Sequence, residues 1–207
     1  MTGEIPLIAF FGPDGSGKST VTDLIEKRLV AEEKVVIRYH WRPRALPSLK
    51  KDYSTLSFNN PNKLKIRKYI VSIGCYIYFF FDFLVARRLY FKKSKDSNSI
   101  ILYERYYFDI LFHPRRYRLT SINWLGSFLS RFLRKPNITF VLVGTPEAIH
   151  DRKPELQVAE IKRQIDIMSD KLPNLCKTVI IDTDKSNAAE VSAEIVSIIS
   201  DNVNGKA

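Results

Sequence analysis

The feature that most constrains the fold is a buried-strand pattern that runs directly into a glycine-rich turn. Residues 5–11 form a continuous apolar run, which is typical of a strand covered on both faces in a parallel sheet. Residues 12–19 read Gly-Pro-Asp-Gly-Ser-Gly-Lys-Ser and match G-x-x-x-x-G-K-[ST] at every fixed position. A helix is expected to follow, over about 19–33. Strand, turn and helix in this order predict a P-loop that binds the phosphates of a nucleoside triphosphate.

Each position in this turn has an expected physical role. Glycines allow successive backbone amides to point at phosphate oxygens, and the N-terminus of the next helix adds partial positive charge. Lys18 is expected to neutralise the β- and γ-phosphates, and the Ser19 hydroxyl to ligate Mg²⁺. The alternative, a glycine-rich turn arisen by chance, is disfavoured by the pattern and its context together. The predicted nucleotide-binding residues are Gly12, Asp14, Gly15, Ser16, Gly17, Lys18, Ser19 and Thr20.

The rest of the chain alternates strands with helices. A long surface loop is expected at 42–62, and the last helix is expected to begin after Asn187, with Glu190 placed as a reciprocal cap. Further strands are expected at 35–41, 99–103, 138–143 and 178–182, and further helices at about 62–91 and 158–172. This alternation predicts an α/β fold with a central five-stranded parallel sheet and helices on both faces.

Composition narrows the partners and the compartment. Of the 207 residues, 33 are lysine or arginine and 22 are acidic, and the net charge of +11 favours nucleotides, nucleic acid or a membrane surface. The basic residues are dispersed, and no groove-reading or base-stacking module is evident, so nucleic acid is disfavoured. Two cysteines, Cys75 and Cys176, form neither a disulfide framework nor a zinc motif, which points to the cytoplasm.

Three segments carry a resemblance to a known family. Residues 11–20, Phe-Gly-Pro-Asp-Gly-Ser-Gly-Lys-Ser-Thr, resemble the opening of thymidylate kinases, whose P-loop contains a carboxylate, here Asp14. Residues 101–106, Ile-Leu-Tyr-Glu-Arg-Tyr, are similar to the family's Asp-Arg-Tyr/His motif, with glutamate in place of aspartate. Residues 136–147 resemble its fourth strand and the turn after it. The resemblance implies one NMP-kinase-like P-loop domain over 1–207, with an acceptor-binding region at about 40–118 and a short helical lid at about 146–172.

The acceptor segments depart from that family. Residues 39–47, Tyr-His-Trp-Arg-Pro-Arg-Ala-Leu-Pro, replace the family's Arg-Glu-Pro-Gly-Gly segment, and residues 107–118 differ from its Ala-Tyr-Gln region. Here the chain resembles a divergent group of thymidylate kinase-like proteins associated with surface-polysaccharide genes. We therefore expect the triphosphate half of the site to be kept and the acceptor half to be rebuilt.

The resemblance implies roles for individual side chains. Glu104, at the end of a central strand, would hold Mg²⁺ directly or through water beside Ser19, and the alternative is a carboxylate that only pairs with Arg105. Arg105 would reach the transferred phosphoryl group, and the alternative is a structural ion pair. Because Gly15 leaves the turn without an arginine of its own, Arg152 in the lid would supply that charge. Arg163 lies eleven residues further on, three turns along the same helical face, where it could assist. A solvated helix face is the alternative for Arg152 and the favoured interpretation for Arg163. The predicted catalytic residues are Asp14, Lys18, Arg105 and Arg152, and the predicted metal ligands are Ser19 and Glu104.

The acceptor side is less determined. Arg42 and Arg44 are candidates for binding an anionic acceptor, and Tyr107 for stacking on a base or sugar ring, although loop solvation and core packing are the alternatives. If the acceptor is an alcohol, Asp14 or Asp109 is expected to accept its proton; a phosphate acceptor is already ionised and needs no base.

Residues 69–86 form an apolar stretch that contains one charge, Asp82, and has basic flanks. By length it reaches a membrane span, but Asp82 and its place between two sheet strands favour a buried core helix. A helix with one face on a membrane surface is the alternative. We expect a cytoplasmic protein, either free or peripheral to the inner face of the membrane, and a homodimer stays open.

These features predict an ATP- and Mg²⁺-dependent phosphotransferase that transfers the γ-phosphoryl group to a nucleoside monophosphate. Two alternatives remain open: a kinase for a sugar or glycan hydroxyl, including a lipid-linked one, and a basic NTPase associated with nucleic acid or a membrane. A regulatory GTPase is disfavoured because the sequence has no Asn-Lys-x-Asp motif.

Overall fold

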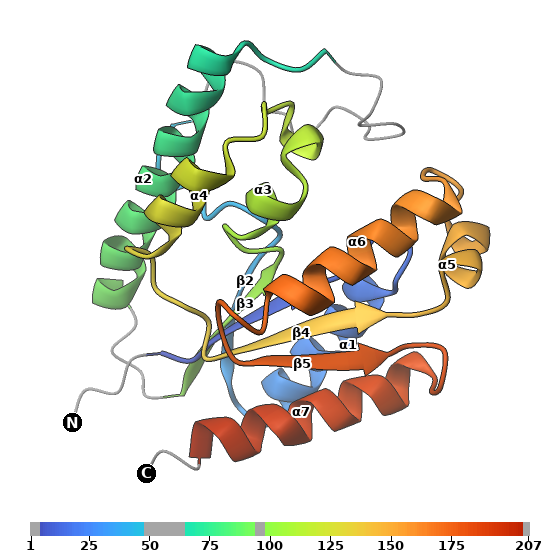
Figure 1. Ribbon diagram of the computed structural model, residues 1–207. Coiled ribbons are helices and arrows are strands. Elements are labelled where there is room, and N and C mark those ends of the chain that lie inside the picture. Colours follow the sequence, from blue (N-terminus) through green and yellow to red (C-terminus); the bar gives the residue numbers. More distant parts are fainter. Residues whose placement is uncertain (1–4, 48–64, 94–97, 205–207) are drawn as a thin grey trace. The chain divides into compact units, whose positions relative to one another are not determined.

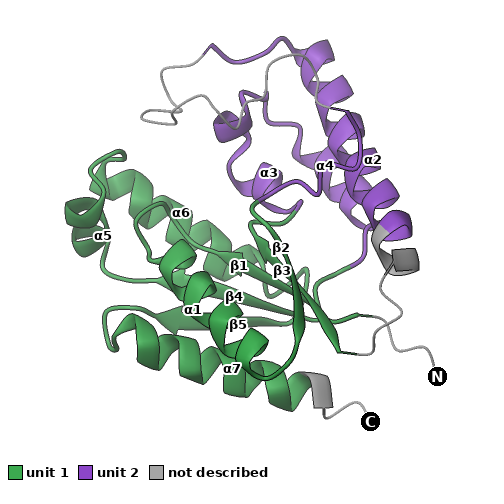
Figure 2. Cartoon of the chain, turned by 180° about the vertical axis from the view of Figure 1, so that it is seen from behind, with its two compact units in different colours: residues 1–40, 94–106, 135–207 green, residues 41–93, 107–134 purple. Residues whose placement is uncertain are grey.

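The computed structural model describes residues 5–47, 65–93 and 98–204. The chain forms two compact units (Figure 2). Unit 1 consists of Met1–His40, Ser94–Tyr106 and Lys135–Ala207, and unit 2 of Trp41–Lys93 and Tyr107–Arg134. Unit 2 is therefore discontinuous in sequence, and its two segments follow the second and third strands of unit 1.

Unit 1 is built on a five-stranded, all-parallel sheet, as the sequence predicts (Figure 1). The strands lie in the order β2-β3-β1-β4-β5. Phe10 of β1 is in register with Glu104 of β3 on one side and with Phe140 of β4 on the other. The strands are β1 (Leu7–Phe11), β2 (Val35–Tyr39), β3 (Ser99–Glu104), β4 (Ile138–Val143) and β5 (Thr178–Asp182).

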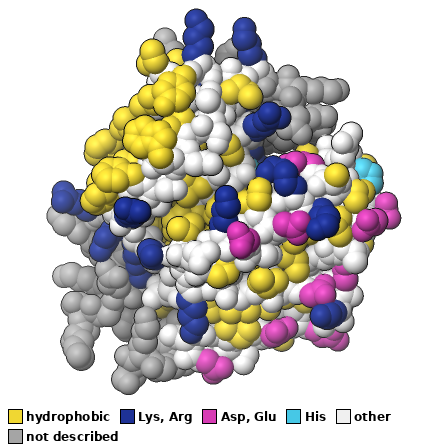
Figure 3. All heavy atoms as spheres, in the orientation of Figure 1, with side chains coloured by type: hydrophobic (Ala, Val, Ile, Leu, Met, Phe, Trp, Pro, Cys, Tyr) yellow, Lys and Arg dark blue, Asp and Glu magenta, His cyan; other side chains and the backbone are white. Residues whose placement is uncertain are grey.

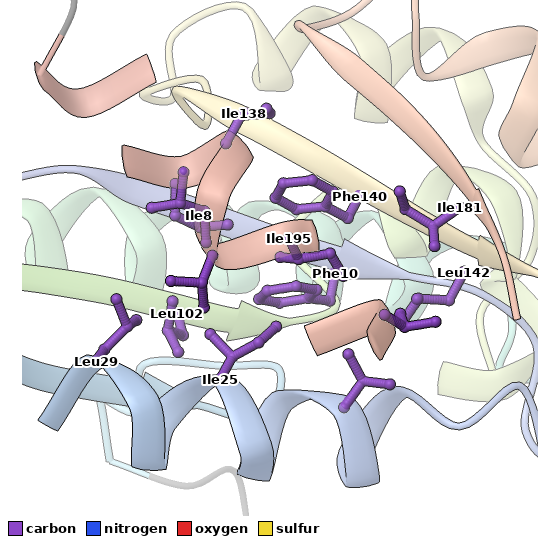
Figure 4. Close-up of a cluster of buried hydrophobic side chains, with 14 of the residues drawn as sticks. Ile8, Phe10, Ile25, Leu29, Leu102, Ile138, Phe140, Leu142, Ile181 and Ile195 are labelled. Atoms are coloured by element: carbon purple, nitrogen blue, oxygen red, sulfur yellow. The ribbon is translucent and has the colours of Figure 1, made fainter. Parts of the chain in front are cut away.

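Helices cover both faces of this sheet. On one face, α1 (Lys18–Ala31) and α7 (Ala188–Asn204) pack together over alternate residues of the strands and enclose the main hydrophobic core (Figure 4). Phe10 and Phe140 stack in this core, with ring centroids 5.6 Å apart. On the other face, α6 (Val158–Lys171) lies along β4 and packs against the short helix α5 (Pro146–Arg152) (Figure 1).

The cap predicted for the last helix is present. The side-chain oxygen of Asn187 accepts hydrogen bonds from the backbone amides of Ala189 and Glu190, both at 3.0 Å, and the Glu190 carboxylate accepts one from the Asn187 amide at 3.2 Å. These bonds satisfy the amides at the start of α7 that have no partner within the helix.

Unit 2 is helical in its described residues. Its elements are α2 (Tyr69–Lys93), α3 (Asp109–Phe112), a 3₁₀ turn η2 (Pro114–Tyr117) and α4 (Asn123–Ser130). Helix α2 begins at Tyr69, later than the pattern predicts, and residues 48–62 of the predicted loop lie outside the described residues. Helices α2 and α4 approach closely at Gly126, where a Cβ atom would lie 3.0 Å from the Tyr76 ring.

The segment Tyr69–Leu89 of α2 is long and apolar enough to cross a membrane, with a mean hydropathy of 1.8. Length and composition alone are weak evidence of a span, because the core helix of a soluble protein passes the same test. One face of α2 is buried within the protein, as the reading of a core helix requires.

Candidate active site

The glycine-rich turn, residues 12–19, joins the carboxyl end of β1 to the start of α1. Gly12 has φ 145°, and a Cβ atom there would lie 2.4 Å from the Leu142 carbonyl oxygen of β4. Gly17, directly before α1, has the left-handed φ of 81° but open space where a Cβ would stand. Gly12 is therefore required by both conformation and space, and Gly17 by conformation alone.

Lys18 is the first residue of α1, and its side chain folds back over the turn. The ammonium group donates hydrogen bonds to the Pro13 carbonyl oxygen and, at 3.4 Å, to the Ser16 hydroxyl. Lys18 and Ser16 are both buried, whereas Ser19 and Thr20 are exposed. The positive charge of Lys18 is thus held against the glycine-rich turn itself, close to the backbone amides that would bind an anion there.

Glu104, the last residue of β3, is the centre of a polar cluster beside the turn. Its Oε2 accepts a hydrogen bond from the Ser19 hydroxyl at 2.9 Å and lies 3.5 Å from His40 Nδ1. Its Oε1 accepts bonds from the guanidinium of Arg38, which also pairs with Asp23 and Glu26 of α1. Burial would raise the pKa of Glu104, but the hydrogen bonds from His40, Arg38 and Ser19 outweigh it and lower the pKa to about 2.

The residues of this cluster fit a magnesium ion. Mg²⁺ prefers oxygen ligands and is usually held by one or two protein oxygens together with water and phosphate. Ser19 and Glu104 supply a hydroxyl and an ionised carboxylate that already lie side by side. Within the described residues no group of three or more His, Cys, Asp or Glu side chains forms an all-protein metal cage, which a site completed by phosphate does not need.

Asp14 and Arg105 form an ion pair across the other side of the turn. Arg105 follows β3, is buried, and has a positive φ of 66°, while its amide donates to the Phe10 carbonyl at 2.8 Å. Burial would raise the pKa of Asp14, but Arg105, Lys18 and Lys153 hold it at about 2. The left-handed backbone of a non-glycine residue is costly, and such strain is concentrated at functional sites.

The segment predicted as the lid reaches the turn through Lys153 and not through Arg152. Arg152 donates to the Asp184 carboxylate at 2.7 Å, and its side chain is half-exposed. A Cβ atom on Gly15 would instead lie 3.1 Å from the Lys153 Cβ, and Lys153 contributes to the lowered pKa of Asp14. Arg163 does not share a helix with Arg152, because α5 ends at Arg152 and Arg163 lies in α6. It lies on an exposed helix face, bound to Glu160 of its own helix through two hydrogen bonds of 2.7 and 2.6 Å.

In unit 2, Arg42 is bound by protein side chains. Its Nε donates to Asp82 at 2.8 Å, another nitrogen donates to the Tyr78 hydroxyl at 3.1 Å, and Asp82 also accepts the Leu46 amide at 2.8 Å. The Asp82 side chain is fully buried. Arg42 thus ties the chain after β2 to the middle of α2, whereas Arg44 is exposed, with a φ of 55°.

Asp109 is buried in unit 2 with two polar neighbours. It lies 3.2 Å from Nδ1 of His113 and accepts a hydrogen bond from Tyr117. Tyr117 also stacks on Trp41, with centroids 4.0 Å apart, so the Trp41 ring is committed to packing. Tyr107 is fully buried, and burial raises the pKa of its hydroxyl. Among the described residues, neither the Tyr107 hydroxyl nor His113 Nε2 has a hydrogen-bond partner.

The structure therefore brings five of the predicted residues together within unit 1, namely Asp14, Lys18, Ser19, Glu104 and Arg105. The predicted acceptor residues Arg42, Arg44, Tyr107 and Asp109 all belong to unit 2. The sequence reasoning missed Arg38 and Lys153, and it gave His40 and His113 structural roles only. A basic residue inside an otherwise apolar strand was the available signal for Arg38; nothing in the local pattern distinguishes Lys153 from Arg152.

No protein-family model and no curated protein matches this chain.

Proposed function

We propose that this protein is a P-loop phosphotransferase that uses ATP with Mg²⁺. The observation that carries the proposal is the meeting of the Lys18 turn with the Ser19–Glu104 pair at the carboxyl edge of the sheet. β1 lies between β3 and β4, and the chain leaves β1 toward β2 but leaves β3 and β4 in the opposite direction along the sheet. In open α/β sheets, ligands bind at the carboxyl ends of strands where the direction changes in this way.

The residues of unit 1 supply binding and alignment. The backbone amides of the turn and the start of α1 hold phosphate oxygens, and Lys18 neutralises their charge. Ser19 and Glu104 would hold the magnesium ion, and a bound ion would supply neutralisation of the charge on the transferred group. Arg105 lies beside the turn, where its guanidinium balances negative charge on the phosphoryl group, and Asp14 fixes its orientation.

For the acceptor, we propose a nucleoside monophosphate, as the resemblance to thymidylate kinases implies. Arg42, Arg44 and Tyr107 are the residues proposed to contact it. Arg42 is bonded to Asp82, so its use on an acceptor phosphate requires exchange of one carboxylate partner for another anion. Arg44 is exposed and has no ion-pair partner among the described residues.

A second candidate acceptor is an alcohol, such as a sugar or glycan hydroxyl. The observation that favours it is the pair of Asp109 with His113, in which a buried carboxylate contacts one ring nitrogen and leaves Nε2 without a partner among the described residues. An imidazole oriented by a carboxylate in this way is suited to accept a hydroxyl proton. A phosphate acceptor gives such a pair no proton to take.

The test is calorimetry of Mg²⁺–ATP binding, followed by ADP release with monophosphates and sugars as acceptors. The wild-type chain is expected to bind Mg²⁺–ATP, and Lys18→Met to weaken binding at least about a hundred-fold, by loss of a buried charge-assisted contact. Lys27→Met, on the exposed side of α1, is the matched control and is expected to bind normally. Folded wild-type protein that takes up no Mg²⁺–ATP would refute the proposal.

A further inference from the structure

Helix α2 carries apolar side chains on two opposite faces between Tyr69 and Ala86. Tyr76 and Phe79 are buried on the face that packs within the protein. The opposite face carries Ile70, Ile77 and Phe81, whose exposed fractions are 81, 39 and 47%. A helix that packs on a core needs only one apolar face, so packing accounts for the first face and not for the second.

Helix α4 and the residues after it carry a second exposed apolar stripe. Trp124, Phe128 and Phe132 follow one another at intervals of four and are 67, 50 and 57% exposed. The rings of Phe128 and Phe132 meet edge to face, with centroids 5.2 Å apart. Large aromatic side chains at this exposure are costly to hydrate, which again points to a surface that is covered in use.

The two stripes lie on neighbouring helices of unit 2. Helices α2 and α4 pack directly on each other at Gly126 and Tyr76. Figure 3 shows hydrophobic side chains gathered over these two helices. We call this surface the apolar patch; it consists of Ile70, Ile77, Phe81, Trp124, Phe128 and Phe132.

The charges near the patch have one sign. Lys65 and Lys68 are exposed before α2, and Arg87 and Arg88 are exposed near its end. Arg88 lies 18 residues after Ile70, which is five full turns and returns it to the same face of the helix. Of the described residues of unit 2, only Asp82 and Asp109 carry a carboxylate, and both are buried. Every exposed charge on the described part of unit 2 is therefore positive.

We propose that the apolar patch docks on the surface of an anionic lipid bilayer. Aromatic and aliphatic side chains enter the boundary between headgroups and acyl chains, and the lysines and arginines at both ends of α2 contact anionic headgroups. A second copy of this chain fits less well, because it would bring two surfaces with only positive exposed charges together, and like charges at an interface repel.

Docking is peripheral, because α2 is anchored in the protein. The Asp82 carboxylate, in the middle of the helix, is buried against Arg42, and spanning a bilayer would break that ion pair and expose the charge to hydrocarbon. The proposal is independent of the phosphotransferase function, since none of the patch residues belongs to unit 1.

Flotation of the full chain with lipid vesicles tests the proposal. We expect co-flotation with vesicles of phosphatidylglycerol and phosphatidylcholine at low salt, loss of most binding at high salt, and no binding to pure phosphatidylcholine. Trp124 is a native reporter, and its fluorescence is expected to shift to the blue and to be quenched by brominated lipids on binding. Protein that stays at the bottom of the gradient with anionic vesicles at low salt overturns the proposal.

Variants identify the surface that binds. Phe128→Ser with Phe132→Ser changes two exposed rings and is expected to reduce vesicle binding at least ten-fold, with Mg²⁺–ATP binding and thermal melting unchanged. Val30→Ser, 56% exposed on α1 of unit 1, is the matched apolar control and is expected to bind like the wild type. Arg87→Gln with Arg88→Gln is expected to weaken binding and flatten its salt dependence, whereas Lys27→Gln with Lys171→Gln is not.

Three results would overturn the proposal. If Val30→Ser reduced vesicle binding as much as Phe128→Ser with Phe132→Ser, binding would not be confined to the patch. Resistance of the bound protein to alkaline extraction would show a spanning helix. A dimer in sedimentation that Phe128→Ser with Phe132→Ser dissociates, without binding to anionic vesicles, would identify the patch as an interface between copies of this chain.

Discussion

The Ser19 hydroxyl donates a hydrogen bond of 2.9 Å to Glu104, although 85 positions separate the two residues in sequence. The sheet brings them together, because Phe10 of β1 is in register with Glu104 of β3 and the turn after β1 leads directly to Ser19. The same carboxylate is bound by Arg38, which is anchored in turn on Asp23 and Glu26 of α1. The start of α1 and the end of β3 are thereby fixed to each other by side chains.

Replacement of Glu104 by glutamine is expected to raise the Mg²⁺ concentration that half-maximal ATP binding requires by about 10- to 100-fold. The reason is that the amide lacks the negative charge that attracts the ion. Titration of Mg²⁺ at fixed ATP in a calorimeter measures the shift. Glu104→Asp is expected to recover part of the affinity. Glu26→Gln, which removes a different partner of Arg38, is the control and should leave the Mg²⁺ dependence unchanged. An unaltered Mg²⁺ requirement in Glu104→Gln would contradict the assignment of Glu104 as a ligand.

Acid is expected to destabilise the protein through the same carboxylate. The pKa of Glu104 is lowered from an ordinary 4.5 to about 2 in the folded state, so the unfolded chain binds its proton first. The stabilisation is complete above about pH 4.5 and is lost as the pH falls toward 2, and for this nearly buried group it amounts to roughly 3 kcal/mol. Urea unfolding between pH 3 and 7 measures it. A Glu104→Gln variant with the same pH slope as the wild type would refute this.

Substitution by alanine is expected to lower the free energy of unfolding by different amounts at two glycines of the turn. Gly12→Ala places a methyl group against the Leu142 carbonyl in a positive-φ conformation, and we expect a loss of at least about 3 kcal/mol. Gly17→Ala has room for the methyl group and pays only for the left-handed backbone, about 1 to 2 kcal/mol. Thermal and urea unfolding of the two variants, compared directly, check the order, and equal losses would count against the close approach at Gly12.

The pH dependence of transfer is expected to distinguish the two candidate acceptors. If an alcohol is the substrate, the transfer rate should fall at acid pH as the base that accepts the hydroxyl proton becomes protonated, and His113→Gln and Asp109→Asn should each remove that limb. A phosphate acceptor should leave the profile of both variants parallel to the wild type. Single-turnover rates between pH 5 and 8 give the profile, and Asp14→Asn in the same series tests the other carboxylate proposed as a base.

The sequence was sufficient for the sheet and the turn because their signals are local. Short, mostly apolar segments identified all five strands, and the Asn187–Glu190 cap lies within four residues of chain. Helices α3 and α4 were not predicted, since they have only four and eight residues, too few for a helical period to emerge from an aromatic-rich segment.

The sequence was sufficient to predict which side chains gather where the end of β3 meets the turn after β1, and insufficient where contacts depend on residues far apart in the chain. Lys153 faces Gly15 because the chain leaves the helical conformation there, with φ −152° and ψ 89°, so helical periodicity does not describe its direction. Arg38 became part of the Glu104 cluster through the pairing of β2 with β3, which no local pattern specifies.

The two segments of unit 2 both depart from the chain directly after a sheet strand, one after β2 and one after β3. All five strands of the sheet and the turn after β1 lie outside these two segments. Under the proposed function, the residues for the acceptor and those for the nucleotide lie in different units. Exchange of residues 41–93 and 107–134 as a pair between related scaffolds is then expected to change the acceptor and to leave Mg²⁺–ATP binding as it was.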